Sequence, residues 1–82
     1  MEEVQKEKLR RKISTALRAT RKQLGISQEK MAELLGISPR SYVDLERGKS
    51  LCSTPVFLRF LLYSGISATE FLAELDRVLT SQ

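Results

Sequence analysis

The chain has 82 residues and a mass of 9.3 kDa, and 41% of its residues are hydrophobic while 29% are charged. This composition is typical of one small globular domain and argues against a disordered chain. There is no histidine and only one cysteine, Cys52, which excludes His-based acid–base catalysis, an intrachain disulfide and the usual zinc sites within one chain. We therefore expect a protein that is not an enzyme and that needs no metal or cofactor.

Positive charge is concentrated in the first three-fifths of the chain, and the net charge of the whole is +4. Residues 1–49 contain 12 Lys and Arg against 7 Asp and Glu, or +5, whereas residues 50–82 contain 2 against 3, or −1. One-sided basic character is typical of proteins that bind an anionic partner such as nucleic acid. The alternative is an ordinary solvated surface of mixed charge.

Nothing in the sequence predicts export or membrane insertion. The longest apolar run, 56–63, is interrupted by Arg59 and is far too short to cross a bilayer. Residues 1–12 alternate Glu with Lys and Arg and lack the apolar stretch of a secretory signal. Together with the single cysteine, which fits a reducing compartment, these features predict a cytoplasmic protein that does not contact a membrane.

Glycine, serine and proline divide the chain into five predicted helices. Three joints share the tripeptide Gly-Ile-Ser, in which Gly ends one helix in the left-handed conformation and Ser caps the start of the next. The three copies lie at 25–27, 36–38 and 65–67. Pro39 and Pro55 each follow a capping residue, Ser38 or Thr54, and so take the first helical position. In chain order the predicted helices span residues 3–24, 28–35, 39–47, 55–64 and 68–80.

Between these joints the apolar residues recur with the spacing of amphipathic helices, and no stretch alternates with the period of a strand. The third helix is predicted to bury Tyr42 and Leu45. The helix at 55–64 is apolar nearly all the way round, with Arg59 as its main exception, so that it must be covered on more than one side. The fold class is therefore predicted to be all-α.

Two short predicted helices separated by a single Gly-Ile-Ser make residues 28–47 a helix-turn-helix. The stretch from Ile26 reads Ile-Ser-Gln-Glu-Lys-Met-Ala-Glu-Leu-Leu-Gly-Ile-Ser, and Tyr42, Leu45-Glu46 and Gly48-Lys49 follow it. These residues resemble the phage-repressor/Cro family, also called the xenobiotic-response-element-type helix-turn-helix, from about Leu17 to Leu72. The resemblance implies a lambda-repressor-like, five-helix DNA-binding domain over residues 1–82, whose third helix enters the major groove of double-stranded DNA.

The resemblance places the base-reading residues on the third helix. In this family the first position of that helix often carries a glutamine that reads adenine, and Pro39 departs from this pattern because proline has no side-chain donor. Base reading is therefore expected from Arg40, Ser41 and Asp44, with Arg40 bonding to guanine O6 and N7. For Asp44 two alternatives stay open: it accepts a hydrogen bond from a cytosine amine, or it pairs with Arg40 or Arg47 and holds the guanidinium in place.

Other residues are expected to bind the DNA backbone, which positions the protein without reading sequence. Gln28 matches the family's phosphate-binding glutamine at the start of the second helix, where free backbone N–H groups also favour a phosphate oxygen. The alternative for Gln28 is an ordinary exposed residue. The remaining candidates lie at the turn and in the loop after the third helix: Ser38, Arg47, Lys49 and Ser50.

Two further features are expected to be structural. Arg21 and Glu46 match a family pair that bridges the first helix to the end of the third, and the resemblance implies a buried ion pair between them. Cys52 lies in the loop after the third helix. Nothing nearby in the sequence activates its thiol, so an inert thiol is predicted in preference to a redox switch.

The last two helices, 55–80, are expected to form a dimer interface. A chain this small covers only part of the apolar fourth helix, and the apolar side chains left over mark an interface. A two-fold dimer then places two third helices roughly 34 Å apart over a pseudo-palindromic site, and the alternative is a monomer. The candidate interface residues are Leu58, Leu62, Tyr63, Leu72 and Leu79. Together with Val56 they form a set of which some members are expected to remain uncovered.

The sequence as a whole predicts a sequence-specific, double-stranded-DNA-binding transcriptional regulator, in the first place a homodimeric repressor. It resembles small stand-alone regulators such as phage or mobile-element repressors and controllers of restriction–modification genes. A second hypothesis is a protein-binding helical module, such as an antitoxin whose last two helices bind a toxin. The sequence indicates no particular operator, regulated gene or small-molecule effector.

Overall fold

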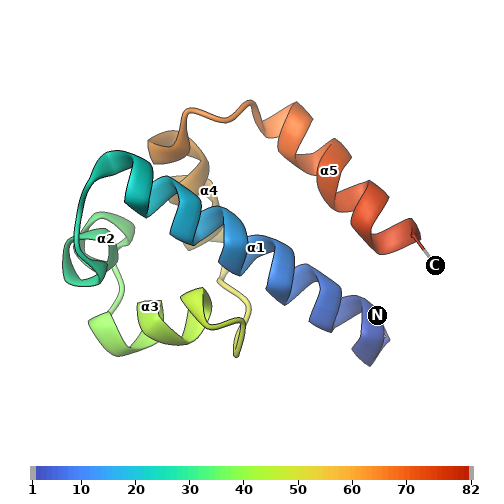
Figure 1. Cartoon of the computed structure of the whole chain (residues 1–82), viewed down its shortest axis with the longest axis horizontal. Coiled ribbons are helices and arrows are strands. Elements are labelled where there is room, and N and C mark those ends of the chain that lie inside the picture. Colours follow the sequence, from blue (N-terminus) through green and yellow to red (C-terminus); the bar gives the residue numbers. More distant parts are fainter. Residues whose placement is uncertain (1, 82) are drawn as a thin grey trace.

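Five α-helices account for the secondary structure of residues 2–81, the part of the chain that the computed structural model describes (Figure 1). No strand occurs in this part of the chain, and the all-α class predicted from the sequence is confirmed. The helices are α1 (Glu3–Leu24), α2 (Gln28–Leu35), α3 (Pro39–Glu46), α4 (Thr54–Ser64) and α5 (Ala68–Thr80).

The Gly-Ile-Ser tripeptides end and begin helices as predicted. Between α2 and α3, Gly36 has a φ of 75°, in the left-handed region where a residue with a Cβ is strained. Ser38 then caps α3 by accepting a hydrogen bond from the backbone N–H of Ser41 at 3.1 Å. Ser27 caps α2 and Ser67 caps α5 in the same way. Local signals therefore determine where these helices begin and end.

Helix α4 begins one residue earlier than predicted, because Ser53 and not Thr54 is its capping residue. The Ser53 hydroxyl accepts a hydrogen bond from the Val56 backbone N–H at 3.5 Å, and Pro55 takes the second helical position. Proline is accommodated there because the first four N–H groups of a helix have no partner within it. Helix α3 ends at Glu46, one residue before its predicted end.

The core lies between α1 and the four shorter helices. Helix α1 packs against α3, α4 and α5, while α2 packs against α3 and α4. The largest fully buried side chains come from all five helices: Leu17, Met31, Leu35, Tyr42, Phe60 and Phe71. Because α3 turns its apolar residues toward this core, its opposite side faces solvent at the edge of the molecule (Figure 1).

Helix α5 runs alongside α1 in the opposite direction, so that the two ends of the described chain lie near each other (Figure 1). Lys12 Nζ of α1 lies 3.1 Å from a carboxylate oxygen of Glu74 in α5. The ring of Phe71 packs against two rings of α4, with centroids 5.6 Å from Phe57 and 5.9 Å from Phe60. These polar and aromatic contacts hold α5 against the rest of the chain.

No single helix within residues 2–81 is both long and apolar enough to span a bilayer. Helices α4 and α5 reach that length and composition only as a pair, and the pair is bent by 119° at its break. Both helices also contribute side chains to the core, Val56 and Phe60 from α4 and Phe71 and Leu75 from α5.

Candidate nucleic-acid interface

Helices α2 and α3 form a tight helix-turn-helix, of which one side packs on the core and the other faces solvent. Ala32 of α2 is fully buried, and Tyr42 and Leu45 of α3 face the core. In the turn, the backbone N–H of Ile37 donates to the Ala32 carbonyl at 3.0 Å, while Gly36 supplies the left-handed conformation. The turn therefore holds α3 at a defined angle and leaves its outer side uncovered.

The predicted base-reading residues Arg40 and Ser41 are exposed on this outer side of α3. The Ser41 hydroxyl accepts a hydrogen bond from the Ser38 hydroxyl at 2.9 Å, which leaves its own proton to be donated outward. Within residues 2–81, none of the ion pairs includes Arg40. Its guanidinium donors are therefore available to a partner molecule.

Asp44 lies at the edge of this face, half-buried against the loop that follows α3. It lines a hollow of ≈ 220 Å³ together with Ser41 and Ser50. The expected alternative pairing with Arg40 or Arg47 is not formed, since no ion pair in the described residues includes Asp44. An exposed arginine loses rotamer entropy when it is held in an ion pair and gains little in water, so i,i+4 or i,i+3 spacing alone did not produce the pair.

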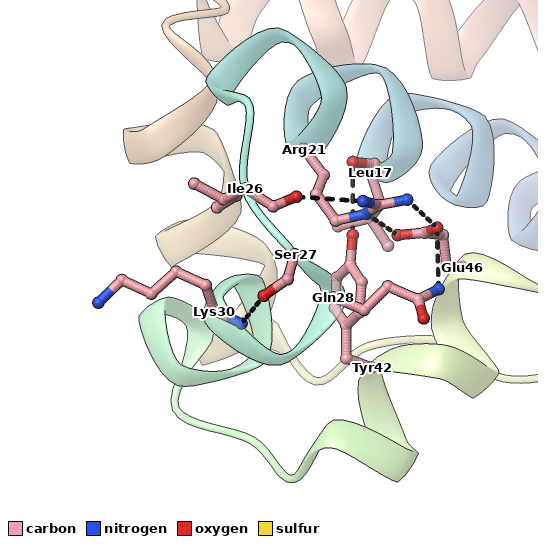
Figure 2. A network of polar contacts seen from close by, with 8 residues as sticks. All are labelled: Leu17, Arg21, Ile26, Ser27, Gln28, Lys30, Tyr42 and Glu46. Carbon is pink, nitrogen blue, oxygen red and sulfur yellow. Dashed lines mark hydrogen bonds and ion pairs between the residues drawn. The ribbon is translucent and has the colours of Figure 1, made fainter.

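Figure 2 shows a polar network that links α1 to the start of α2 and the end of α3. Arg21 Nε donates to Glu46 Oε2 at 2.9 Å and Nη2 donates to Oε1 at 3.0 Å, which makes a bidentate ion pair. Arg21 Nη1 also donates to the Ile26 carbonyl at 3.1 Å. The side chains are 18% and 5% exposed, so Glu46 is buried, as expected for the pair, while Arg21 is partly exposed.

Gln28 belongs to the same network, which the sequence analysis did not anticipate. Its Nε2 donates one hydrogen to Glu46 Oε1 at 3.2 Å (Figure 2). An amide nitrogen carries two donors, so a second N–H remains at the N-terminus of α2. The Ser27 hydroxyl caps this helix by accepting from the backbone N–H of Lys30, so it does not occupy the N–H groups of the first two residues of α2. Gln28 therefore keeps donors for an anion while Glu46 holds its side chain in place.

Burial and hydrogen bonding act in opposite directions on Glu46. Burial alone raises the pKa of its carboxyl, but hydrogen bonds, among them those from Arg21 and Gln28, outweigh this and the pKa lies below its ordinary value. Burial also raises the pKa of Tyr42, whose hydroxyl donates to the Leu17 carbonyl at 3.5 Å (Figure 2). At neutral pH the network therefore holds an ionised Glu46 and a neutral Tyr42.

Residues 15–76 match a family model described as a helix-turn-helix domain. The chain belongs to this helix-turn-helix family. The match includes all of α2, α3 and α4, and it confirms the resemblance to the phage-repressor/Cro type. Neither the curated proteins nor the solved structures give a match to this chain. Membership indicates a DNA-binding regulator, in a family that is typically not enzymatic.

Besides Gln28, the backbone-binding residues predicted for this helix-turn-helix chain fall into two groups. Arg47, Lys49 and Ser50 have exposed side chains in the loop after α3, and the backbone N–H of Lys49 donates to the Asp44 carbonyl at 2.9 Å. Ser38, in contrast, uses its hydroxyl as the cap of α3 and donates its proton within the turn. Loop side chains thus present donors outward, whereas Ser38 serves to position α3.

Cys52 lies half-buried between two hollows of this helix-turn-helix domain. One hollow is the one beside Asp44, and the other is lined by Leu9, Phe57 and their neighbours. Burial raises the pKa of the Cys52 thiol, which lowers the fraction of reactive thiolate at neutral pH. The environment therefore favours the unreactive thiol predicted from the sequence.

Arg59 makes a contact that the sequence analysis missed. From α4 its Nη1 donates to the Leu35 carbonyl at 3.2 Å, at the C-terminus of α2, where a cationic group is favourable. A Cβ at position 36 would displace this guanidinium, which is the flexible end of the Arg59 side chain, so the main requirement for Gly36 is its left-handed φ. The available signal was a lone arginine in an apolar helix, but its partner is 24 residues away.

The predicted dimer residues differ in exposure. The exposed ones are Leu58 at 54%, Leu62 at 82%, Tyr63 at 43% and Leu72 at 55%. Leu79 is half-buried. Val56 belongs to the core with 9% exposure, because its side of α4 packs inward, so it is not among the side chains left uncovered. Helix α4 of this helix-turn-helix chain thus divides its apolar side chains between core and solvent.

Proposed function

We propose that this chain is a sequence-specific, double-stranded-DNA-binding transcriptional regulator that inserts α3 into the major groove. The observation that carries the proposal is the exposure of Arg40 and Ser41 on a helix whose Tyr42 and Leu45 are buried on the other side. A helix presented in this way reaches base edges with its polar side while its apolar side stays in the core.

Base reading is assigned to three residues of α3. Arg40 has free guanidinium donors that suit guanine O6 and N7, a contact worth about 1–3 kcal/mol of discrimination. Next to Arg40, the Ser41 hydroxyl can donate a hydrogen bond to a base. Asp44, at the edge of the face, accepts a hydrogen bond from a cytosine amine. Pro39 has no side-chain donor, so the first position of α3 contributes only shape.

Backbone binding is assigned to the two ends of the helix-turn-helix. Gln28 offers one amide hydrogen and the first N–H groups of α2 to a phosphate oxygen. At the other end, Arg47, Lys49 and Ser50 project from the loop after α3. Ser38 contributes by fixing the start of α3. These contacts position the protein and make its affinity depend on salt.

The exposed apolar side chains of α4 and α5 support a homodimer. Leu62 is 82% exposed and Leu58 is 54% exposed, and burying such side chains against a second copy removes apolar surface from water. A two-fold dimer presents two α3 helices to a pseudo-palindrome with half-sites roughly 34 Å apart. A dimer bound at a promoter excludes other proteins from the same grooves, which supports repression as the regulatory outcome.

The DNA-binding surface is tested by titrating nitrogen-15-labelled protein with a duplex of random sequence and following the amide NMR signals. We expect shifts at Gln28, including its side-chain amide, and through 38–50, with the signals of α5 unchanged. Shifts restricted to α4 and α5, or none at salt of about 50 mM, would contradict DNA binding through the helix-turn-helix.

A further inference from the structure

The polar side of α1 meets the end of α3 along one line of residues. Ser14, Arg18 and Arg21 are spaced i, i+4 and i+7 and therefore share one face of α1. Arg21 contacts Glu46 at one end of this line. At the other end, Ser14 lies against Gly48, where an added Cβ would come within 3.6 Å of the Ser14 hydroxyl. Arg18 is therefore positioned between two contacts that α1 makes with the end of α3.

A groove of ≈ 290 Å³ lies at this place, and both Arg18 and Arg47 line it. The nearby acids are already occupied. Glu46 is bound by Arg21 at 2.9 Å, and Glu7 at the far end of the groove is bound by Arg11 at 2.8 Å. None of the ion pairs in residues 2–81 includes Arg18 or Arg47. The groove thus holds two guanidinium groups whose charges the protein does not compensate.

Two like charges that share a groove repel each other, and the repulsion is relieved when an anion lies between them. Guanidinium groups present planar pairs of donors that match phosphate oxygens. The groove adjoins the backbone-binding loop after α3, because Arg47 is the first residue of that loop and also lines the groove. After Lys49 the loop carries no charged residue up to Arg59, so positive charge on this side of α3 continues onto α1 and not along the loop.

We propose that Arg18 and Arg47 together bind one phosphodiester group of the DNA backbone, so that the DNA interface extends from the helix-turn-helix onto α1. This inference rests on the DNA-binding function proposed above. Arg18 is a backbone-binding residue in this account and reads no base. Its removal therefore weakens binding to every DNA sequence by the same factor.

The experiment measures dissociation constants at salt concentrations from about 50 to 200 mM for two duplexes of equal length. One duplex is selected by the protein from a random pool and the other is a scrambled sequence. The variants are Arg18→Gln, the charge-retaining Arg18→Lys, and Arg77→Gln as a matched control, because Arg77 is exposed near the end of α5. Thermal unfolding of each variant checks that the fold is retained.

We expect Arg18→Gln to reduce the slope of log K against log salt by about one per bound subunit, with equal fold losses on both duplexes. Arg18→Lys restores most of the slope, and Arg77→Gln leaves it unchanged. In duplexes with single methylphosphonate substitutions, neutralising the shared phosphate weakens binding by the wild-type protein more than binding by Arg18→Gln, in which only Arg47 still contacts that phosphate.

Equal slopes for Arg18→Gln and Arg77→Gln, with wild-type binding intact, would overturn the α1 phosphate site and leave the proposed function standing. A loss on the selected duplex alone would overturn it as well, because it would make Arg18 a base-reading residue. If the wild-type protein retained no duplex from the random pool and did not bind the scrambled one, both this inference and the proposed function would fall.

Discussion

The helix-turn-helix and the α4–α5 segment both use serine caps at helix starts and glycine at helix ends, but they differ in how much of their apolar surface is buried within the chain. Met31, Leu35 and Tyr42 of α2 and α3 are fully buried, and the polar groups behind them are joined by the Arg21–Glu46 pair. In α4, by comparison, Leu62 remains 82% exposed. The first region completes its packing within one chain, whereas the second keeps apolar surface that a partner can bury. Capping residues therefore determine where each helix begins and ends, whereas packing against the other helices determines how much of its apolar surface is buried.

The largest expected effect comes from breaking the polar network of the first region. Arg21→Met leaves the Glu46 carboxylate buried without its bidentate partner, which costs about 3–5 kcal/mol of unfolding free energy. Urea unfolding measures this loss. The adjacent, exposed Lys22→Met serves as control and is expected to change stability by less than about 0.5 kcal/mol. Equal losses in the two variants would contradict the structural role of the ion pair.

A second prediction tests the exposed apolar surface of α4. Leu62→Lys places a charge at the proposed interface and is expected to weaken self-association by about 2 kcal/mol per subunit. The free energy of unfolding of the monomer stays nearly unchanged, because Leu62 is 82% exposed. Sedimentation analysis of both proteins provides the measurement. A wild-type protein that stays monomeric at micromolar concentration and on DNA would remove the homodimer and favour a different protein as the partner of α4.

Arg40→Ala tests base reading by α3. The variant is expected to lose about 1–3 kcal/mol of affinity for the cognate duplex, because a bidentate contact with guanine is removed. Its affinity for random DNA should fall much less. Dissociation constants for the two duplexes under the same salt conditions give the comparison. Equal losses on both would reassign Arg40 to a phosphate contact.

The pH dependence of stability follows from Glu46. Its pKa in the folded protein lies below the ordinary value of 4.5, so the unfolded chain binds the proton more tightly and protonation favours unfolding. The stabilisation is fully present above the ordinary value and is lost as the pH falls through the folded value, with a slope of at most about 1.4 kcal/mol per pH unit. The free energy of unfolding of Glu46→Gln, measured at pH values above and below the range in which Glu46 titrates, should lack the pH dependence that Glu46 contributes in the wild-type protein.

Arg47→Ala has the smallest expected effect on DNA recognition. The variant should weaken binding to cognate and random duplexes alike and reduce the salt slope by about one per bound subunit. Salt titrations on both duplexes measure it. A loss confined to the cognate duplex would place Arg47 among the base-reading residues.

The sequence predicted those features that depend on neighbouring residues. Gly36 and Ser38 mark the turn because left-handed φ values and side-chain caps are properties of single positions. The start of α4 was off by one because Ser53 and Thr54 are adjacent capping residues of similar strength. Such errors move a boundary by one residue and leave the fold unchanged.

Features that depend on packing between segments distant in the sequence could not be predicted from the sequence in the same way. The Gln28–Glu46 hydrogen bond joins residues 18 apart, and the Arg59 contact with Leu35 joins residues 24 apart. Neither follows from helical spacing, because each requires the crossing of two helices to be known. For Asp44, spacing suggested a pairing along α3, but the side chain lies against the following loop. The roles of the site residues in binding remain predictions that the experiments above address.

The most direct test of DNA recognition by α3 is selection of bound duplexes from a random pool, carried out with the wild-type protein and with Arg40→Ala. We predict that the wild-type protein enriches two inverted half-sites with centres one turn of DNA apart. Guanine should be required at one position of each half-site, and this requirement should be lost in Arg40→Ala. A wild-type pool that shows no enriched sequence, or one whose enrichment is unchanged by Arg40→Ala, would contradict recognition through this face.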